Sequence, residues 1–215
     1  MPIPSTITPV RLMSLIPKLD ARDSKLSISE RFKANQHQSH PAIDLVCQQI
    51  RLLELTSTIA ASNIEGKFHC VLLSLCPTYT ALSYTWGDPA KSRTIQVGGK
   101  RLVIPENLWL FLCLYKTNEL EEPPLFWIDA ICIDQANVLE RNHQVGLMKQ
   151  IYTKAANVVV GLGREADHSD LAMSFIAKKG SAPLKPKGDG FRRMWTRDEG
   201  KALVALCQRS YWRRI

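Results

Sequence analysis

The fold is decided by residues 125–133, LFWIDAICI, an almost continuous apolar run that contains a single carboxylate. Apolar side chains recur at helical spacing over residues 137–155, and a second apolar run, NVVVGL, follows at 157–162. Strands without polar alternation, separated by a helix, are typical of a parallel sheet covered on both faces. We therefore expect a right-handed βαβ unit with inner strands at 125–133 and 157–162.

Working outward, β-rich and helical segments alternate in both directions. Residues 79–86, YTALSYTW, are rich in β-forming types and stop at the breaker GDP. Two short β-rich runs flank the Gly-Gly pair at 98–99, the pattern of a tight hairpin. Further expected elements are an N-terminal hairpin (50–55 and 68–72), helices (105–118, 170–178 and 198–208) and a loop (180–196). The predicted class is α/β, with a mainly parallel central sheet plus an N-terminal β-hairpin.

The net charge of +8 comes entirely from the end of the chain. Residues 178–215 hold 11 Lys/Arg and 3 Asp/Glu, whereas residues 1–177 hold 17 of each sign. A nucleic-acid-binding domain carries its basic surface on folded elements, so we expect no nucleic-acid partner. The basic tail is either a solvated loop or a contact for an acidic partner or a membrane surface.

Cysteine usage and apolar run lengths indicate the compartment. The six cysteines form no Cys-x-x-Cys pair and have no metal-ligand spacing to the five histidines. No apolar run approaches the roughly 18 residues that cross a bilayer. We therefore expect reduced thiols, no metal, no membrane span and a cytoplasmic location. Residues 1–44 are mostly polar and lack a period, so we expect a flexible extension before a domain at 45–215.

Two segments resemble the signatures of a known family. Residues 79–88, YTALSYTWGD, resemble the first signature of the fungal heterokaryon incompatibility (HET) domain, and residues 126–135, FWIDAICIDQ, resemble the second. The resemblance continues in register to residue 163 and is weaker beyond it. It implies a module of fungal non-self recognition, in which incompatible cell fusion triggers programmed cell death.

HET domains are similar in turn to Toll/interleukin-1 receptor (TIR) domains. The resemblance therefore implies a TIR/flavodoxin-like three-layer sandwich that acts by self-association, or with other HET/TIR-like or NOD-like receptor proteins. Some TIR domains hydrolyse NAD with a glutamate in a helix after a tryptophan-containing segment. HET domains usually continue a segment like 210–215, SYWRRI, into Trp-x-x-Gln-Glu, and that position falls beyond Ile215. We therefore expect an incomplete HET domain without catalytic residues.

Two alternatives to signalling stay open. One is a TIR-like enzyme that hydrolyses NAD or another nucleotide, with NAD as the ligand. The sequence contains neither Gly-x-Gly-x-x-Gly nor Gly-x-x-x-x-Gly-Lys-Ser/Thr, the two glycine-rich motifs that bind phosphate. The other is a truncated, non-functional HET fragment, because a lost terminal helix would leave apolar area exposed.

A pocket is expected where the loops after residues 86 and 133 meet. Ligands of open parallel sheets bind beyond the carboxyl ends of the strands. Aromatic faces and carboxylates there suit a nucleoside. The candidate lining residues are Tyr84, Trp86, Asp88, Asp129, Cys132, Asp134 and Gln135.

Each candidate has a competing structural interpretation. Trp86 would plug the top of the core, Asp88 would make a turn, and Cys132 would be a small buried apolar residue. Asp129, inside an apolar strand, would be a hydrogen-bond hub, and Asp134 would end that strand.

The helix at 137–155 invites two further predictions. Asn137 and Glu140 have the spacing of a capping box, which argues against a catalytic acid at Glu140. Four apolar residues at helical spacing should face the sheet. They are Val145, Met148, Tyr152 and Ala155.

Overall fold

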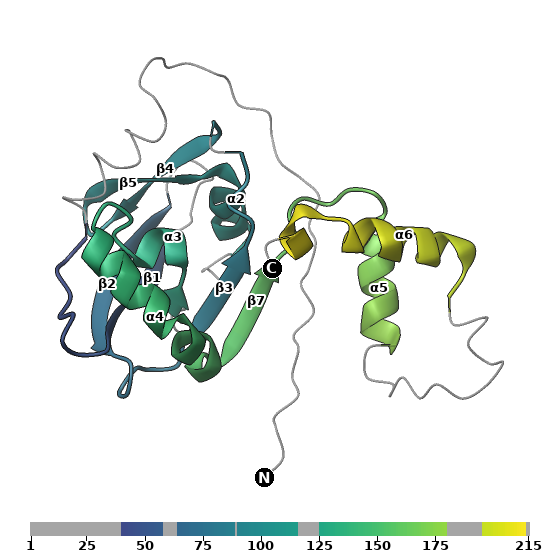
Figure 1. Ribbon diagram of the computed structural model, residues 1–215. Coiled ribbons are helices and arrows are strands. Elements are labelled where there is room, and N and C mark those ends of the chain that lie inside the picture. The colour runs from purple at the N-terminus through teal and green to yellow at the C-terminus, as the bar shows by residue number, and fades with distance from the viewer. Residues whose placement is uncertain (1–39, 58–63, 89, 116–124, 180–194, 214–215) are drawn as a thin grey trace, which may run out of the picture. The chain divides into compact units, whose positions relative to one another are not determined.

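A computed structural model describes residues 40–57, 64–88, 90–115, 125–179 and 195–213 (Figure 1). The chain divides into two compact units. Of the described residues, those from 40 to 161 form the sheet unit and those from 162 to 213 form the helical unit. Of the predicted flexible extension, residues 1–44, the part from 1 to 39 lies outside the described residues.

One seven-stranded sheet forms the centre of the sheet unit, in the order β5-β4-β2-β1-β6-β3-β7. The strands are β1 (Gln49–Ser57), β2 (Glu65–Leu72), β3 (Thr80–Tyr84), β4 (Ser92–Val97), β5 (Lys100–Pro105), β6 (Leu125–Trp127) and β7 (Asn157–Gly161). Three neighbouring pairs are parallel, namely β2–β4, β3–β6 and β3–β7. The other three pairs are antiparallel. The sheet is therefore mixed, and the prediction of a mainly parallel sheet is wrong, because both hairpins join the sheet instead of standing beside it.

Both predicted hairpins are confirmed. β1 pairs with β2, and β4 pairs with β5 through Gly98 and Gly99. The two glycines have φ of 58° and 75°, which a two-residue type I′ turn requires and which other residues adopt at a cost.

The strand predicted at 125–133 is half right. β6 ends at Trp127, and Asp129–Cys132 forms the short helix α3 instead of continuing the strand. The amides of Ile131 and Cys132 both donate to the Ile128 carbonyl, so the backbone turns directly after the strand. The strand predicted at 157–162 forms as β7, but it lies at the edge of the sheet, and Val158 is 48% exposed.

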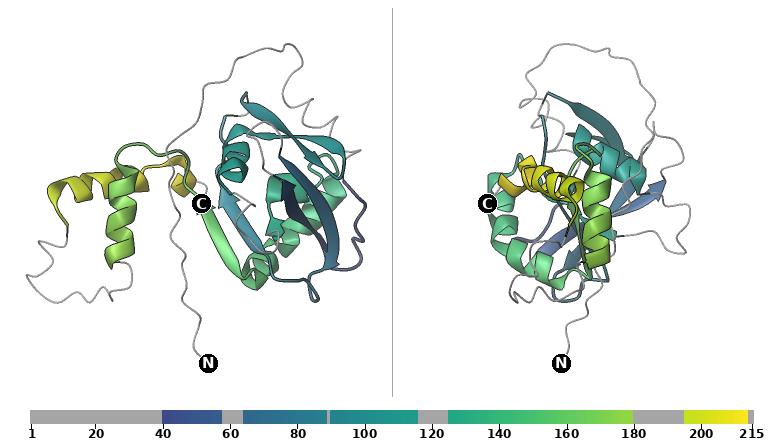
Figure 2. Two further views of the ribbon diagram at one scale, coloured as in Figure 1. Left: turned by 180° about the vertical axis from the view of Figure 1, so that it is seen from behind. Right: turned by 90° about the vertical axis from the view of Figure 1, so that its right-hand side faces the viewer.

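Two helices cover opposite faces of the sheet (Figure 2). They are α2 (Glu106–Leu114) and α4 (Val138–Lys154). Phe111 of α2 contacts Phe126 edge-on, and Tyr152 of α4 contacts the neighbouring Trp127 edge-on. Consecutive side chains of a strand point to opposite faces, so the two contacts place one helix on each side of β6.

The buried face of α4 differs from the prediction. The buried residues are Glu140, Gln144, Leu147 and Ile151. Val145 is 54% exposed, so its predicted place against the sheet is wrong, whereas Met148, Tyr152 and Ala155 do pack against the core. The buried stripe starts at two polar residues because both have hydrogen-bond partners in the fold. Arg51 donates to the carboxylate of Glu140, and Nε2 of Gln144 donates to the Gln49 carbonyl at 2.8 Å.

The helical unit contains α5 (Ser169–Lys179), α6 (Arg197–Cys207) and the 3-10 turn η3 (Ser210–Arg213), confirming the two predicted helices. A capping box starts α6, since Thr196 and Glu199 exchange side chain-to-backbone hydrogen bonds. The buried apolar residues here are Ala172, Ala202 and Leu206. The predicted loop lies outside the described residues except for its last two positions. No helix within the described ranges is long and apolar enough to cross a membrane.

Candidate functional site

The carboxyl ends of the parallel strands β3 and β6 bring Trp86, Asp129 and Gln135 together. The indole Nε1 of Trp86 donates to Asp129 Oδ2 over 3.2 Å, and Gln135 Nε2 donates to the Asp129 carbonyl over 2.9 Å. Asp129 Oδ1 accepts from the amide of Ala130 at 2.8 Å. Three of the seven predicted site residues thus form one connected group, with the half-buried Asp129 at its centre.

The loop that carries Trp86 has little freedom in its backbone. Gly87 has φ of +80°, and a Cβ there would lie 2.4 Å from Asn107 Nδ2. Asn107 in turn donates to the Thr85 carbonyl at 3.3 Å. Glycine is therefore required at 87, and the loop holds Trp86 at the rim with 40% of its surface exposed.

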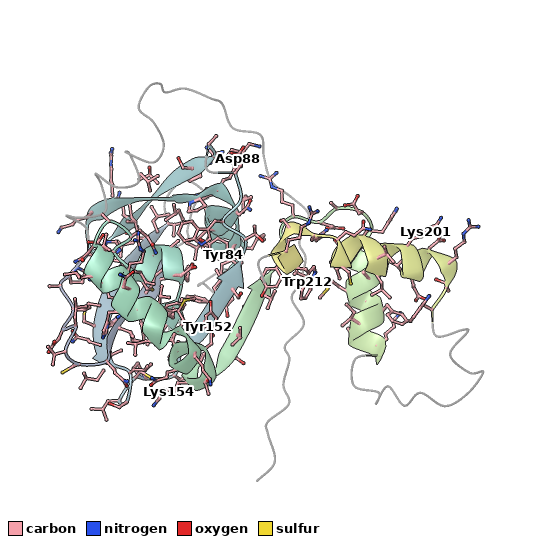
Figure 3. All side chains as sticks on the ribbon, in the orientation of Figure 1. Tyr84, Asp88, Tyr152, Lys154, Lys201 and Trp212 are labelled. Carbon is pink, nitrogen blue, oxygen red and sulfur yellow. The ribbon has the colours of Figure 1, made fainter. Side chains whose placement is uncertain are left out.

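Figure 3 labels the other two candidates of the first signature, Tyr84 and Asp88. Tyr84 ends β3 and is buried, and a Cβ at Gly161 would approach its Cβ to 3.0 Å. Asp88 is exposed, and its Oδ1 accepts from the Ala90 amide at 2.9 Å, which is the predicted turn chemistry.

Cys132 and Asp134 have structural roles in the segment that follows β6. The Cys132 thiol is fully buried and accepts from the Ile128 amide at 3.3 Å. Burial raises the pKa of Cys132 to about 12, so the thiol stays protonated at neutral pH and is a poor nucleophile. Asp134 is buried, and its Oδ1 accepts from the Ala136 amide at 3.0 Å in a local turn.

A buried ion pair that the sequence analysis missed lies beneath the second signature. Arg51 Nη1 and Nη2 donate to the two carboxylate oxygens of Glu140 over 2.5 and 2.9 Å. The remaining N–H groups of Arg51 go to the carbonyls of Pro41 and Cys132. All five guanidinium donors are therefore satisfied, which a buried arginine needs.

Glu140 also corrects the predicted capping box. Asn137 does cap α4, because its side chain accepts from the Glu140 amide at 3.2 Å. The Glu140 carboxylate turns inward instead, and its Oε1 accepts from the Asp134 amide at 2.7 Å. The carboxylate thus joins β1, the 128–137 segment and the start of α4.

Residues 40 and 41 are tied to the same region. His40 Nε2 lies 2.8 Å from the Ile131 carbonyl, and its ring stacks on Phe68 with centroids 5.2 Å apart. A signal for this hub existed in the sequence, since Arg51 lies between the apolar residues Ile50 and Leu52, and a buried charge needs a partner. The partner could not be named, because Glu140 lies 89 residues away.

A second charged cluster lies on β1 and β2. Glu54 accepts from Lys67 at 2.9 Å and is 2.6 Å from Nε2 of His69. Partial burial works against the ionised carboxylate, but these two hydrogen bonds outweigh it and hold the pKa of Glu54 below its ordinary value. Within the described ranges, no group of three His, Cys, Asp or Glu residues is placed to hold a metal ion.

Comparison with known proteins connects this geometry to a family. The model of the family "Heterokaryon incompatibility protein (HET)" matches residues 79–215, which include both signature segments. Heterokaryon incompatibility protein 6, OR allele, from Neurospora crassa is 38% identical over 154 residues. The aligned region is 65% of this chain but 22% of that relative, so the chain spans about a fifth of its length. No solved structure matches. Because the family model matches residues 79–215, more than half of the chain, the chain belongs to the heterokaryon incompatibility (HET) protein family.

Proposed function

We propose that the chain is a signalling module of fungal non-self recognition that triggers programmed cell death by self-association in the cytoplasm. The family assignment supports an incompatibility role. Self-association and cell death come from the resemblance to TIR-like domains. We assign the HET domain to residues 45–215 and the fold to the TIR/flavodoxin-like class, supported by the parallel order β6-β3-β7 between α2 and α4.

The observation that carries the proposal is how the second signature uses its polar groups. The carboxylate of Glu140 is bound by Arg51 and by a backbone amide, and the Cys132 thiol is buried with a raised pKa. These groups hold the segment in one shape instead of presenting reactive atoms to a substrate. A rigid surface for protein contacts is the function that such an arrangement serves best.

The test is regulated expression in a filamentous fungus, with hyphal viability as the readout. Expression of the chain should reduce viability, and Arg51→Ala should abolish the effect because Glu140 is left buried without its partner. Cys132→Ala should keep the effect, because the thiol has no chemical task. Val145→Lys, a change at an exposed position of α4, is the matched surface control. Undiminished viability with the unmodified chain at normal protein level would contradict the proposal.

A nucleotide-directed activity is the second candidate, favoured by the contact between Trp86 and Asp129. An exposed indole edge next to a carboxylate at the carboxyl ends of parallel strands suits a nucleoside. Incubation of the purified chain with NAD should give no turnover under the signalling proposal. Clear turnover that is lost in Asp129→Ala would replace self-association with catalysis.

The remaining alternative, a non-functional fragment, is distinguished from a signalling module by its thermal unfolding. The sheet unit has one continuous buried cluster from β1 to α4, so we expect cooperative unfolding on heating. A melting curve without a cooperative transition would favour the fragment.

A further inference from the structure

A short segment that precedes β1 lies against the second signature. Nε2 of His40 donates to the Ile131 carbonyl at 2.8 Å, since a carbonyl oxygen can only accept. The His40 ring also stacks on Phe68 of β2, with centroids 5.2 Å apart. The carbonyl of Pro41 accepts from Nε of Arg51 at 2.8 Å and from Nη2 of the same side chain. Two adjacent residues therefore contact β1, β2 and α3 at once.

A turn between this segment and β1 directs the segment back along that strand. Oδ1 of Asp44 accepts from the amides of Val46 and Cys47 at 2.8 and 3.4 Å. The Asp44 amide donates to Oε1 of Gln49, the first residue of β1, at 2.7 Å. An aspartate that accepts from amides just after it in the chain is ordinary turn chemistry. We call residues 40–44 the strap, because the turn fixes one end at β1 and the other end is bound at α3.

The strap can leave its place without opening the sheet. Pro41 and Asp44 are exposed, and His40 is half-buried. Among the described residues, the buried core cluster starts at Ile50, so the strap contributes no buried side chain to it. Segments with few buried contacts open at a much lower free energy than the whole domain. Release of the strap is therefore a local event.

Release would change the second signature, because the strap completes the buried hub. Arg51 is 1% exposed and would lose the acceptor that its Nε and Nη2 share. The same guanidinium donates to the Cys132 carbonyl and to the Glu140 carboxylate, which accepts from the Asp134 amide. The Ile131 carbonyl would lose its histidine donor. Three positions of the second signature thus depend on whether the strap is bound.

We propose that the strap is a conformational switch for the second signature. While the strap is bound, the segment 128–137 is held in one shape, and when the strap is released, that segment opens locally. Two elements that share contacts are coupled by a free energy that acts equally in both directions. A partner that draws the strap away would thereby open the second signature without touching it. This inference goes beyond the proposed function, because it does not depend on what the second signature contacts.

Amide hydrogen exchange of the full chain, followed by NMR, tests the coupling. His40→Ala removes a hydrogen bond and a ring contact of the strap, so the amides of Cys132 and Asp134 should exchange at least about fivefold faster. The amides of the β3–β7 ladder should keep their rates, because the sheet does not open. His69→Ala is the matched control. It removes a histidine that contacts Glu54 at 2.6 Å on the other face of β2, and it should leave the exchange of both amides unchanged.

Asp44→Ala tests the strap from its other end. This variant removes the acceptor of two turn amides at an exposed position, so the sheet should fold normally while the strap is held less firmly. Exchange at the amides of Cys132 and Asp134 should rise at least about twofold.

The reverse direction of the coupling is tested with Glu140→Gln and read at the ring protons of His40. In the bound strap, the stacked Phe68 ring displaces these resonances from those of a solvated histidine. Glu140→Gln weakens the hub, so the resonances should move toward the solvated values.

Three results would overturn the inference. Unchanged exchange at Cys132 and Asp134 in both strap variants would show that the strap and the second signature are not coupled. A rise by the same factor in the β3–β7 ladder would mean that the strap only adds to global stability. His40 resonances that stay in place in folded Glu140→Gln would contradict the reciprocity that coupling requires.

Discussion

Two charged clusters start from the same strand, β1, and differ in their access to solvent. The side chains of Arg51 and Glu140 are 1% and 5% exposed. Three residues further along the strand, Glu54 pairs with Lys67 and His69, which are 53% and 38% exposed. In both clusters, a glutamate uses both of its carboxylate oxygens in short contacts with its partners. The comparison teaches that contact geometry alone does not rank charged groups, because burial decides what the loss of a partner costs.

The largest expected effect follows from breaking the buried cluster. Arg51→Ala leaves the Glu140 carboxylate without its main partner in a dry site and should cost about 3–5 kcal/mol of unfolding free energy. Urea unfolding measures it. Replacing both partners by apolar residues, Arg51→Met with Glu140→Leu, should recover most of the loss, because no charge is then buried alone. A single variant that costs less than the double variant would contradict this account.

The next effect concerns the thiol beside the buried pair. With its pKa raised to about 12 and no exposed surface, Cys132 should be alkylated at least about a hundredfold more slowly at neutral pH than the exposed Cys207. Mass spectrometry of iodoacetamide-labelled peptides measures both rates. Arg51→Ala should accelerate labelling at Cys132, because the Cys132 carbonyl loses its donor, and leave Cys207 unchanged. Equal rates in the unmodified chain would show that the segment opens readily.

The sequence predicted those elements whose causes are local. The Gly-Gly hairpin, the Asn137 cap and the extent of α4 all follow from residues close together in the chain. The insertion of β1 between β2 and β6 could not be predicted, because antiparallel pairing of Leu53 with Phe126 is a long-range contact without a sequence signal. Together with the two hairpins, that insertion makes the sheet mixed.

The candidate site also combines a feature that the sequence predicts with one that depends on long-range contacts. The meeting of Trp86 with Asp129 was predictable, because carboxyl ends of parallel neighbours share one edge of the sheet. The role of Glu140 was not, because its spacing from Asn137 fits a capping box equally well. Only the position of Arg51 in the fold decides between capping and ion pairing.

A smaller effect is expected from the cap next to the buried cluster. Asn137→Ala removes the acceptor for the Glu140 amide and should cost about 1 kcal/mol in urea unfolding. Asn137→Asp keeps an acceptor at the helix N-terminus and should cost less. A cost for Asn137→Ala as large as that of Arg51→Ala would mean that the cap, and not the ion pair, positions Glu140.

The smallest effect comes from the exposed cluster and depends on pH. The hydrogen bonds from Lys67 and His69 depress the pKa of Glu54 in the folded state, so their contribution is present above its ordinary value of 4.5. That contribution is lost as the pH falls through the depressed folded value. Glu54→Gln should therefore cost under about 1 kcal/mol near neutral pH, because both partners are solvated and screened. The difference from the unmodified chain should shrink in acid and in high salt, as urea unfolding can measure. A cost of several kcal/mol that persists in acid would place Glu54 in the same class as Glu140, and burial would then not be what separates the two clusters.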